Sequence, residues 1–307
     1  MHATARPFDH SDAARLQPAF GKLISLARHR VNEAVWRPAW KSPAAEEIAA
    51  TRDLARTDGT PWGEAPASTV VPLIRMDLES VLQHVSAVHL MLSQGAGLGL
   101  AIDSETRAAL EAAAQLWWLL DKDLTPRGRV ARLYAHRRDT AVKLEDVLGK
   151  MGISAASGYG AMPADLDKHY EQELGLSVNW TTNANGVTRW VDCEGQAPMK
   201  YSSRVRLFVE KGMGQSPSAG YYAYYCGASH SEGWRILYQY AQATAADGSD
   251  ILKLRTAAAT VNMAVNVCID ALFYAAARAY EYLGDGAGVR LLAMQVEPIK
   301  AAARMPA

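Results

Sequence analysis

Apolar side chains recur along most of the chain at the spacing of an α-helix rather than in the alternation of a β-strand. One such stripe joins Leu16, Phe20, Leu23 and Ala27. The segments with this pattern cover about residues 11–36, 70–93, 104–121, 126–149, 202–211, 218–243, 251–283 and 288–303. The pattern therefore predicts an all-α protein, a multi-helix bundle of about seven or eight helices.

Two stretches depart from the helical pattern. Residues 38–68 are rich in Pro, Gly and charge, which predicts a connection that wraps the surface and contains one short helix near residues 44–57. Residues 175–195 alternate apolar and polar positions around Asn185-Gly186, the strongest short signal for a hairpin. We therefore expect a small β-hairpin or irregular insertion there. The short connection between residues 121 and 126 predicts that the helices it joins form an antiparallel pair.

The composition describes a soluble protein without a strong partner preference. The chain has 307 residues, and its 32 Lys+Arg balance its 32 Asp+Glu. No net positive charge therefore attracts the protein to nucleic acid, although this balance leaves room for a local basic patch. Three widely spaced cysteines fit a reducing compartment. No apolar run reaches the ~18 residues of a membrane span, and the first residues lack a signal-peptide core. We expect a cytoplasmic protein with no membrane partner, in which residues 1–69 form an N-terminal helix and connection that pack on a bundle of residues 70–307.

The first candidate site lies on the predicted helix 126–149. Arg129, Arg132 and His136 fall on nearly one face of it. Arginine holds phosphate through two hydrogen bonds, and histidine moves a proton near neutral pH, so the face suits an anion or a phosphodiester. The alternative is a solvated helix face with ion pairs between successive turns.

Two further candidates lie elsewhere. Glu111 falls within an alanine-rich helix, where it is expected to meet an arginine of residues 126–149 in a half-buried pair that is catalytic or structural. Ser229 and His230 stand between two aromatic blocks, and His230 shares a helical row with large aromatic residues, which predicts an inward position near the Glu111 helix. Neither a His-Glu-x-x-His nor a Glu-x-x-His pattern is present, so we expect no metal and no cofactor.

Two segments carry a resemblance to known proteins. Residues 107–139, RAALEAAAQLWWLLDKDLTPRGRVARLYAHRRD, and residues 219–234, AGYYAYYCGASHSEGW, resemble segments of uncharacterised actinobacterial helical proteins, which are similar in turn to HEPN-like (higher eukaryotes and prokaryotes nucleotide-binding) domains. The resemblance implies a helical fold and a nucleotide or RNA-type ligand, in a defence or stress system. Active HEPN ribonucleases resemble one another in an Arg-x(4–6)-His motif, to which Arg129 and His136 are similar. Val130 follows Arg129 where that family carries a polar residue, so the motif is incomplete.

Three functional hypotheses remain, and whether the protein is an enzyme stays open among them. In the first, a HEPN-like protein binds a nucleotide or RNA, with Arg132 holding a phosphate and His136 transferring a proton. In the second, an enzyme or binding protein takes a small molecule in a cleft between the Glu111 helix and the His230 segment. In the third, a non-catalytic interaction protein dimerises through its Ala- and Tyr-rich helices. A homo-oligomer is expected.

Overall fold

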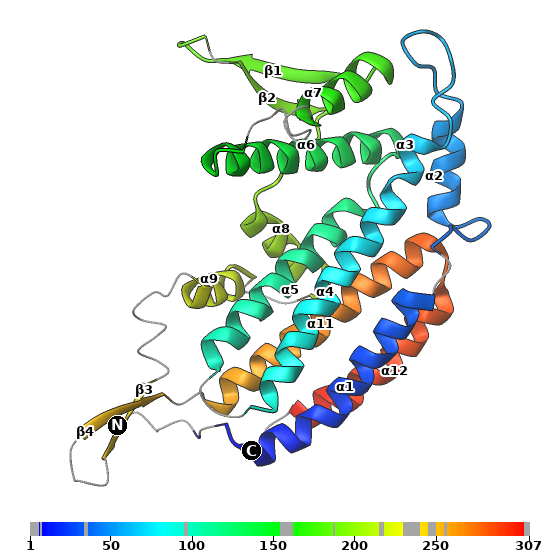
Figure 1. The fold of residues 1–307 in the computed structure, drawn as a ribbon. Coiled ribbons are helices and arrows are strands. Elements are labelled where there is room, and N and C mark those ends of the chain that lie inside the picture. The colour runs from blue at the N-terminus through cyan, green and yellow to red at the C-terminus, as the bar shows by residue number, and fades with distance from the viewer. Residues whose placement is uncertain are drawn as a thin grey trace. The chain divides into compact units, whose positions relative to one another are not determined.

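The structure is a computed structural model that describes residues 6, 8–33, 36–94, 98–153, 162–186, 188–214, 218–229, 240–244, 250–254 and 257–303. The chain is mainly α-helical with small antiparallel hairpins, so the predicted fold class is confirmed (Figure 1). It divides into two compact units. Unit 1 consists of residues 1–36, 74–118 and 201–307, and unit 2 of residues 37–73 and 119–200. The expected segments 1–69 and 70–307 do not coincide with these units.

Three long helices pack side by side in unit 1 (Figure 1). They are α1 (His10–Glu33), α11 (Ala258–Leu283) and α12 (Gly286–Ala303), with α12 against both others. The predicted stripe of α1 is confirmed, because Leu16, Phe20 and Leu23 are fully buried. Helix α11 is long and apolar enough to cross a membrane, but 67% of its apolar window is buried inside the protein. Its hydrophobicity is therefore that of a core helix.

Unit 1 also contains most of α4 (Val70–Leu92) and α5 (Gly99–Leu119), together with α8 (Tyr201–Leu207), the π-helix η3 (Phe208–Gly212) and α9 (Ser218–Ser229). The strands β3 (Tyr240–Thr244) and β4 (Asp250–Leu254) pair antiparallel. The predicted helices over 218–243 and 251–283 are therefore wrong at residues 240–243 and 251–254, which lie in these strands. An Asp247-Gly248 turn signal stands between the two segments in the sequence, but their alanines and leucines favour a helix and hid the hairpin.

Helix α6 (Pro126–Lys150) is the centre of unit 2. It contacts α2 (Pro43–Arg52), α3 (Ala65–Ser68), α7 (Met162–Asp167) and strand β2 (Thr188–Cys193), and α7 continues into the π-helix η2 (Lys168–Glu173). The side chain of Thr125 caps α6 by accepting a hydrogen bond from the Gly128 amide at 3.0 Å, and Pro126 occupies the first turn as predicted. Since α5 belongs chiefly to unit 1, the expected antiparallel pair of α5 and α6 is divided between units.

The predicted hairpin is confirmed in unit 2. Strand β1 (Val178–Thr182) pairs antiparallel with β2, and Gly186, at φ +75°, lies in the turn between them. The preceding connection does more than wrap the surface, because Trp62 is 1% exposed and its Nε1 donates to the Leu174 carbonyl at 3.1 Å. The core of unit 2 therefore includes a residue from the segment expected to lie outside.

Candidate functional site

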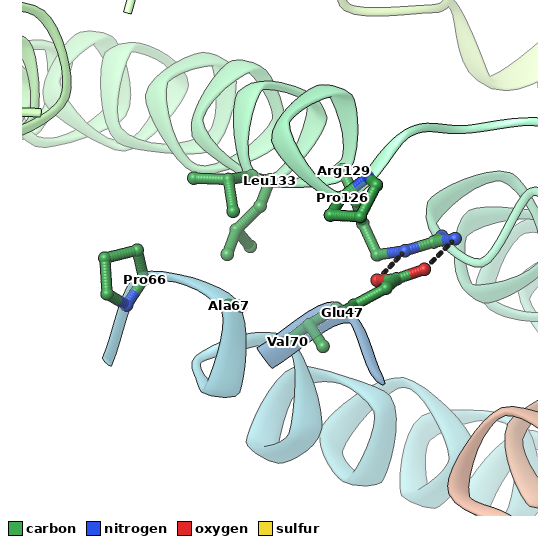
Figure 2. A pocket seen from close by; sticks show the side chains of 8 residues that line it. Glu47, Pro66, Ala67, Val70, Pro126, Arg129 and Leu133 are labelled. Atoms are coloured by element: carbon green, nitrogen blue, oxygen red, sulfur yellow. Dashed lines mark hydrogen bonds and ion pairs between the residues drawn. The ribbon is translucent and has the colours of Figure 1, made fainter. Parts of the chain in front are cut away.

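Arg129, expected to bind an anion, is held inward by acceptors from its own unit. The side chain donates to the two carboxylate oxygens of Glu47 on α2, from Nε at 2.7 Å and from Nη2 at 2.9 Å (Figure 2). Its Nη1 and Nη2 also donate to the carbonyl oxygens of Leu119 at 2.6 Å and Asp121 at 3.0 Å. The hollow beside this pair, between Pro66 and Leu133, does not admit a water molecule (Figure 2). Arg129 therefore joins α6 to α2 and is not open to a ligand.

Arg132 and His136 follow Arg129 on α6. The Nε of Arg132 donates to Oε1 of Gln196 at 3.0 Å, and its Nη1 lies 3.3 Å from Oδ2 of Asp121. Burial lowers the pKa of Arg132 and Asp121 offsets part of this effect, so the guanidinium stays charged. His136 is half-buried one turn later, and its carbonyl accepts from Thr140 Oγ1 at 3.0 Å. The three expected residues thus share one helix, but both guanidiniums already bind protein acceptors.

A cluster of tryptophans and arginine, which the sequence analysis missed, lies farther along α6. The Nε and Nη2 of Arg138 donate to the two carboxylate oxygens of Asp167 at 2.7 and 3.1 Å. Its Cζ lies 4.8 Å from the ring centre of Trp180 and 5.7 Å from that of Trp190. These tryptophans are paired across β1 and β2, and Trp180 is 39% exposed. Their equal distance from Asn185 in the sequence was the signal that could have revealed the pair.

Tyr134 supports the cluster from inside unit 2. Its hydroxyl donates to Oδ1 of Asp167 at 2.5 Å, and its ring stacks on Tyr170 with centroids 4.8 Å apart. Burial, together with the Asp167 carboxylate, raises the pKa of Tyr134, so the phenol stays neutral and keeps its proton for this bond. Asp167 therefore binds two donors at once and fixes the position of Arg138.

Glu111 lies in unit 1, where Arg107 replaces the expected arginine of α6. Its Oε1 accepts from Arg107 Nε at 2.8 Å, on the preceding turn of α5, and from the Tyr222 hydroxyl of α9 at 2.9 Å. Arg107 Nη2 also lies 3.3 Å from that hydroxyl. Burial and the Glu111 carboxylate raise the pKa of Tyr222. Glu111 is thus the acceptor of a local network that joins α5 to α9.

Of the two predicted site residues Ser229 and His230, the structure describes only the backbone of Ser229. Helix α9 ends at Ser229, whose side chain lies outside the described residues, as does the whole of His230. The inward position of His230 therefore stays a prediction. The bond between Tyr222 and Glu111 does show that the helix leading to His230 contacts the Glu111 helix.

A groove of about 530 Å³ lies along α1 and α4 in unit 1. On its wall, His89 Nε2 lies 3.2 Å from the Gln17 carbonyl oxygen, and Arg28 Nη2 donates to Ser86 Oγ at 2.9 Å. The volume falls in the range of small-molecule sites. Among the described residues, no group of three or more His, Cys, Asp or Glu side chains is placed to hold a metal ion.

The chain matches no family model, no curated protein and no solved structure.

Proposed function

We propose that this protein is a HEPN-like cytoplasmic protein that binds a nucleotide or RNA-type ligand by base stacking, acts as a homo-oligomer and does not cleave the ligand. The observation that supports it is the stack of Arg138 and Trp180: the indole is 39% exposed, and the guanidinium beside it is fixed by Asp167. Proteins bind single-stranded nucleic acid with aromatic rings and arginine planes on which bases stack. A ligand base on the open side of Trp180 would extend this stack.

Charge pairing inside unit 2 argues for stacking over phosphate contacts. Each of Arg129, Arg132 and Arg138 binds a carboxylate of its own unit: Glu47, Asp121 and Asp167. A guanidinium that is already paired with a carboxylate attracts an approaching phosphate only weakly. Its contact with the nucleic acid therefore releases few of the counterions bound there. We therefore expect binding to weaken only slightly with salt, with a slope of log K against log salt shallower than about −1, where single strands lose ~0.7 per phosphate contacted.

The same pairing argues against ribonuclease activity at Arg129 and His136. An arginine that stabilises a transferring phosphate needs its donors free to face it, whereas those of Arg129 bind Glu47 and two carbonyl oxygens. We expect purified protein to leave RNA intact. If it degrades RNA, and His136→Ala abolishes the cleavage while the helical circular dichroism is unchanged, then cleavage belongs to the function.

The stacking proposal is tested by fluorescence anisotropy with a labelled single-stranded oligoribonucleotide of about 12 nucleotides. Trp180→Ala should weaken binding by about 5- to 150-fold, which corresponds to ~1–3 kcal/mol for one stacked base. The matched control is Trp40→Ala, since Trp40 is 88% exposed in the same unit and should leave the affinity unchanged. Equal affinity of Trp180→Ala and wild type, equal losses in both variants, or no RNA binding by the wild type would overturn the proposal.

The groove along α1 and α4 favours a second candidate, the binding of a small molecule. It combines apolar Ile24 and Leu90 with the polar groups of Arg28, Ser86 and His89, which suits a small amphiphilic carboxylate. A thermal-shift screen with aliphatic and aromatic carboxylates checks this candidate. A shift that Arg28→Met removes and that Trp180→Ala leaves intact would favour it, and the absence of any shift would exclude it.

A further inference from the structure

The outer face of α12 carries an apolar stripe that unit 1 leaves exposed. Its members follow one another at intervals of four, three and four residues, and they are Ala287, Leu291, Met294 and Pro298. All four are exposed, Leu291 at 42% and Met294 at 69%. The apolar side chains that α12 buries within unit 1 are a different set, which includes Leu292, Val296 and Ile299. The stripe is therefore not the face by which α12 packs in its own unit.

The spacing of the stripe indicates what kind of surface would cover it. Intervals of four and three residues are those of the a and d positions of a heptad, the seam along which two helices pack. Leu291 and Pro298 occupy the a positions, and Ala287 and Met294 the d positions. An exposed seam of this kind fits a second helix with the same pattern.

Two charged residues flank the stripe on one side. Arg290 and Glu297 are exposed, and each directly precedes an a position. Residues seven apart lie almost above one another on a helix, so both charges stand on the same edge of the stripe. A carboxylate accepts from more than one donor, so Glu297 can pair across an interface in addition to its contacts within the chain.

A second copy of α12 running in the opposite direction matches the apolar stripe. In that arrangement each a position lies against a d position of the other helix. Leu291 of one copy then packs on Met294 of the other, and Ala287 packs on Pro298. A twofold axis between the copies repeats both contacts, as in other self-complementary interfaces.

The flanking charges match the same arrangement. When two helices are antiparallel, like edges of the two seams meet, and the reversal of direction brings Arg290 of one copy opposite Glu297 of the other. The twofold axis produces this ion pair twice. When two helices are parallel, opposite edges meet, so Arg290 and Glu297 would face the edge that carries Gly288 and Gln295. The charges therefore favour the antiparallel orientation.

We propose that α12 forms an antiparallel, twofold-symmetric interface with α12 of a second copy of this chain. This inference rests on the homo-oligomer of the proposed function and does not depend on the RNA-type ligand. The seam covers residues 287–298, about three helical turns. A contact of that length is smaller than a standard protein interface, so the dimer should form reversibly.

Sedimentation velocity of the full-length protein tests this interface. The wild type should pass from monomer to dimer between about 1 and 200 μM, as a small interface requires. Arg290→Glu places like charges opposite each other at both ion pairs, and Glu297→Arg does the same. Each should weaken dimerisation by about 5- to 50-fold. The matched control is Lys150→Glu, which reverses an exposed charge on α6 and should leave the dissociation constant unchanged.

Mixing the two variants tests the orientation. In an equimolar mixture, the new carboxylates of Arg290→Glu face the new guanidiniums of Glu297→Arg, and the unchanged residues at 297 and 290 also form opposite pairs. A heterodimer about as stable as the wild-type dimer should therefore appear in the mixture. In a parallel pair these charges do not meet, so mixing would restore nothing.

The possible failures are distinguishable. If the wild type dimerises and both single variants dimerise equally well, this interface is wrong and the homo-oligomer stands. A mixture that stays as monomeric as its two components refutes the antiparallel arrangement. A wild type that is monomeric at every concentration refutes the interface together with the homo-oligomer, and assigns the stripe to a different partner. RNA binding is measured separately through Trp180→Ala, so its failure leaves the interface untouched.

Discussion

Replacing Arg129 by methionine distinguishes a structural role for this arginine from a ligand-binding role. Methionine fills similar space without charge, and it leaves the Glu47 carboxylate, 14% exposed, and the Leu119 and Asp121 carbonyl oxygens without these donors. Removing one partner of a buried ion pair costs about 3–5 kcal/mol. We therefore expect Arg129→Met to lower the free energy of unfolding by that amount, a large share of the stability of a typical protein.

A double-mutant cycle measures the interaction energy between Arg129 and Glu47. Glu47→Gln keeps an acceptor for Arg129 and should cost about 1.5–3 kcal/mol, the worth of a hydrogen bond to a charged group. In Arg129→Met/Glu47→Gln neither charge is left unpaired, so the double variant should cost less than the sum of the two single variants by about 1–3 kcal/mol. Urea unfolding followed by circular dichroism, with linear extrapolation, supplies each free energy.

A matched control lies on the same helix. Lys143 pairs with Asp139 at 2.7 Å but is 59% exposed, so Lys143→Met should change the stability by less than about 0.5 kcal/mol. The reasoning is refuted if Arg129→Met unfolds within about 1 kcal/mol of the wild type and instead loses affinity for RNA. That result would mean that Arg129 leaves Glu47 to meet the ligand.

Three further predictions concern unit 1 and the thiols. Burial raises the pKa of Cys193 and of Cys268 to about 12. Iodoacetamide should therefore label the half-buried Cys226 first in native protein near pH 8, as measured by mass spectrometry. Faster labelling of either buried thiol would contradict this. Because burial raises the folded pKa of Asp77 to about 7, above its ordinary 3.8, the stability that this group contributes when protonated is lost as the pH rises from 4 to 7. Asp77→Asn should flatten this loss, which is at most ~4 kcal/mol, in urea unfolding at several pH values. An unchanged slope would contradict it. Tyr222→Phe should cost about 0.5–1.5 kcal/mol in the same assay, because the carboxylate on α5 loses a donor; no loss would mean that water replaces the hydroxyl.

The long helices could be predicted because their apolar stripes and caps are local features of the sequence. Helix α6 begins at Pro126 after the Thr125 cap, and the hairpin turns at Asn185-Gly186, both as expected. The strands β3 and β4 could not be separated from neighbouring helices, because alanine and leucine favour helix and only pairing across the hairpin selects the extended form. Local propensity failed where a partner strand decided the structure.

The positions of the site residues could be predicted, but their partners could not. That Arg129, Arg132 and His136 share a helix follows from periodicity alone. The acceptor of Arg129 is Glu47, 82 residues away, and no spacing rule encodes that contact. Glu111 is the opposite case, since its partner Arg107 stands one turn earlier on α5, where the rule for neighbouring turns would have found it.

The arginines of α6 support an aromatic rather than a cationic surface for the ligand that we propose for unit 2. Guanidiniums project from more than one side of this helix, toward α2 and toward the hairpin, and a helix can pack on both sides only if each charge meets an acceptor. Glu47 serves Arg129 on one side, and Asp167 serves Arg138 on the other. The packing of α6 thus pairs the positive charges of Arg129 and Arg138 with carboxylates of the same unit. The indole ring of Trp180 beside Arg138 stays partly exposed. A nucleic-acid base can stack on an exposed aromatic ring, whereas a phosphate group cannot.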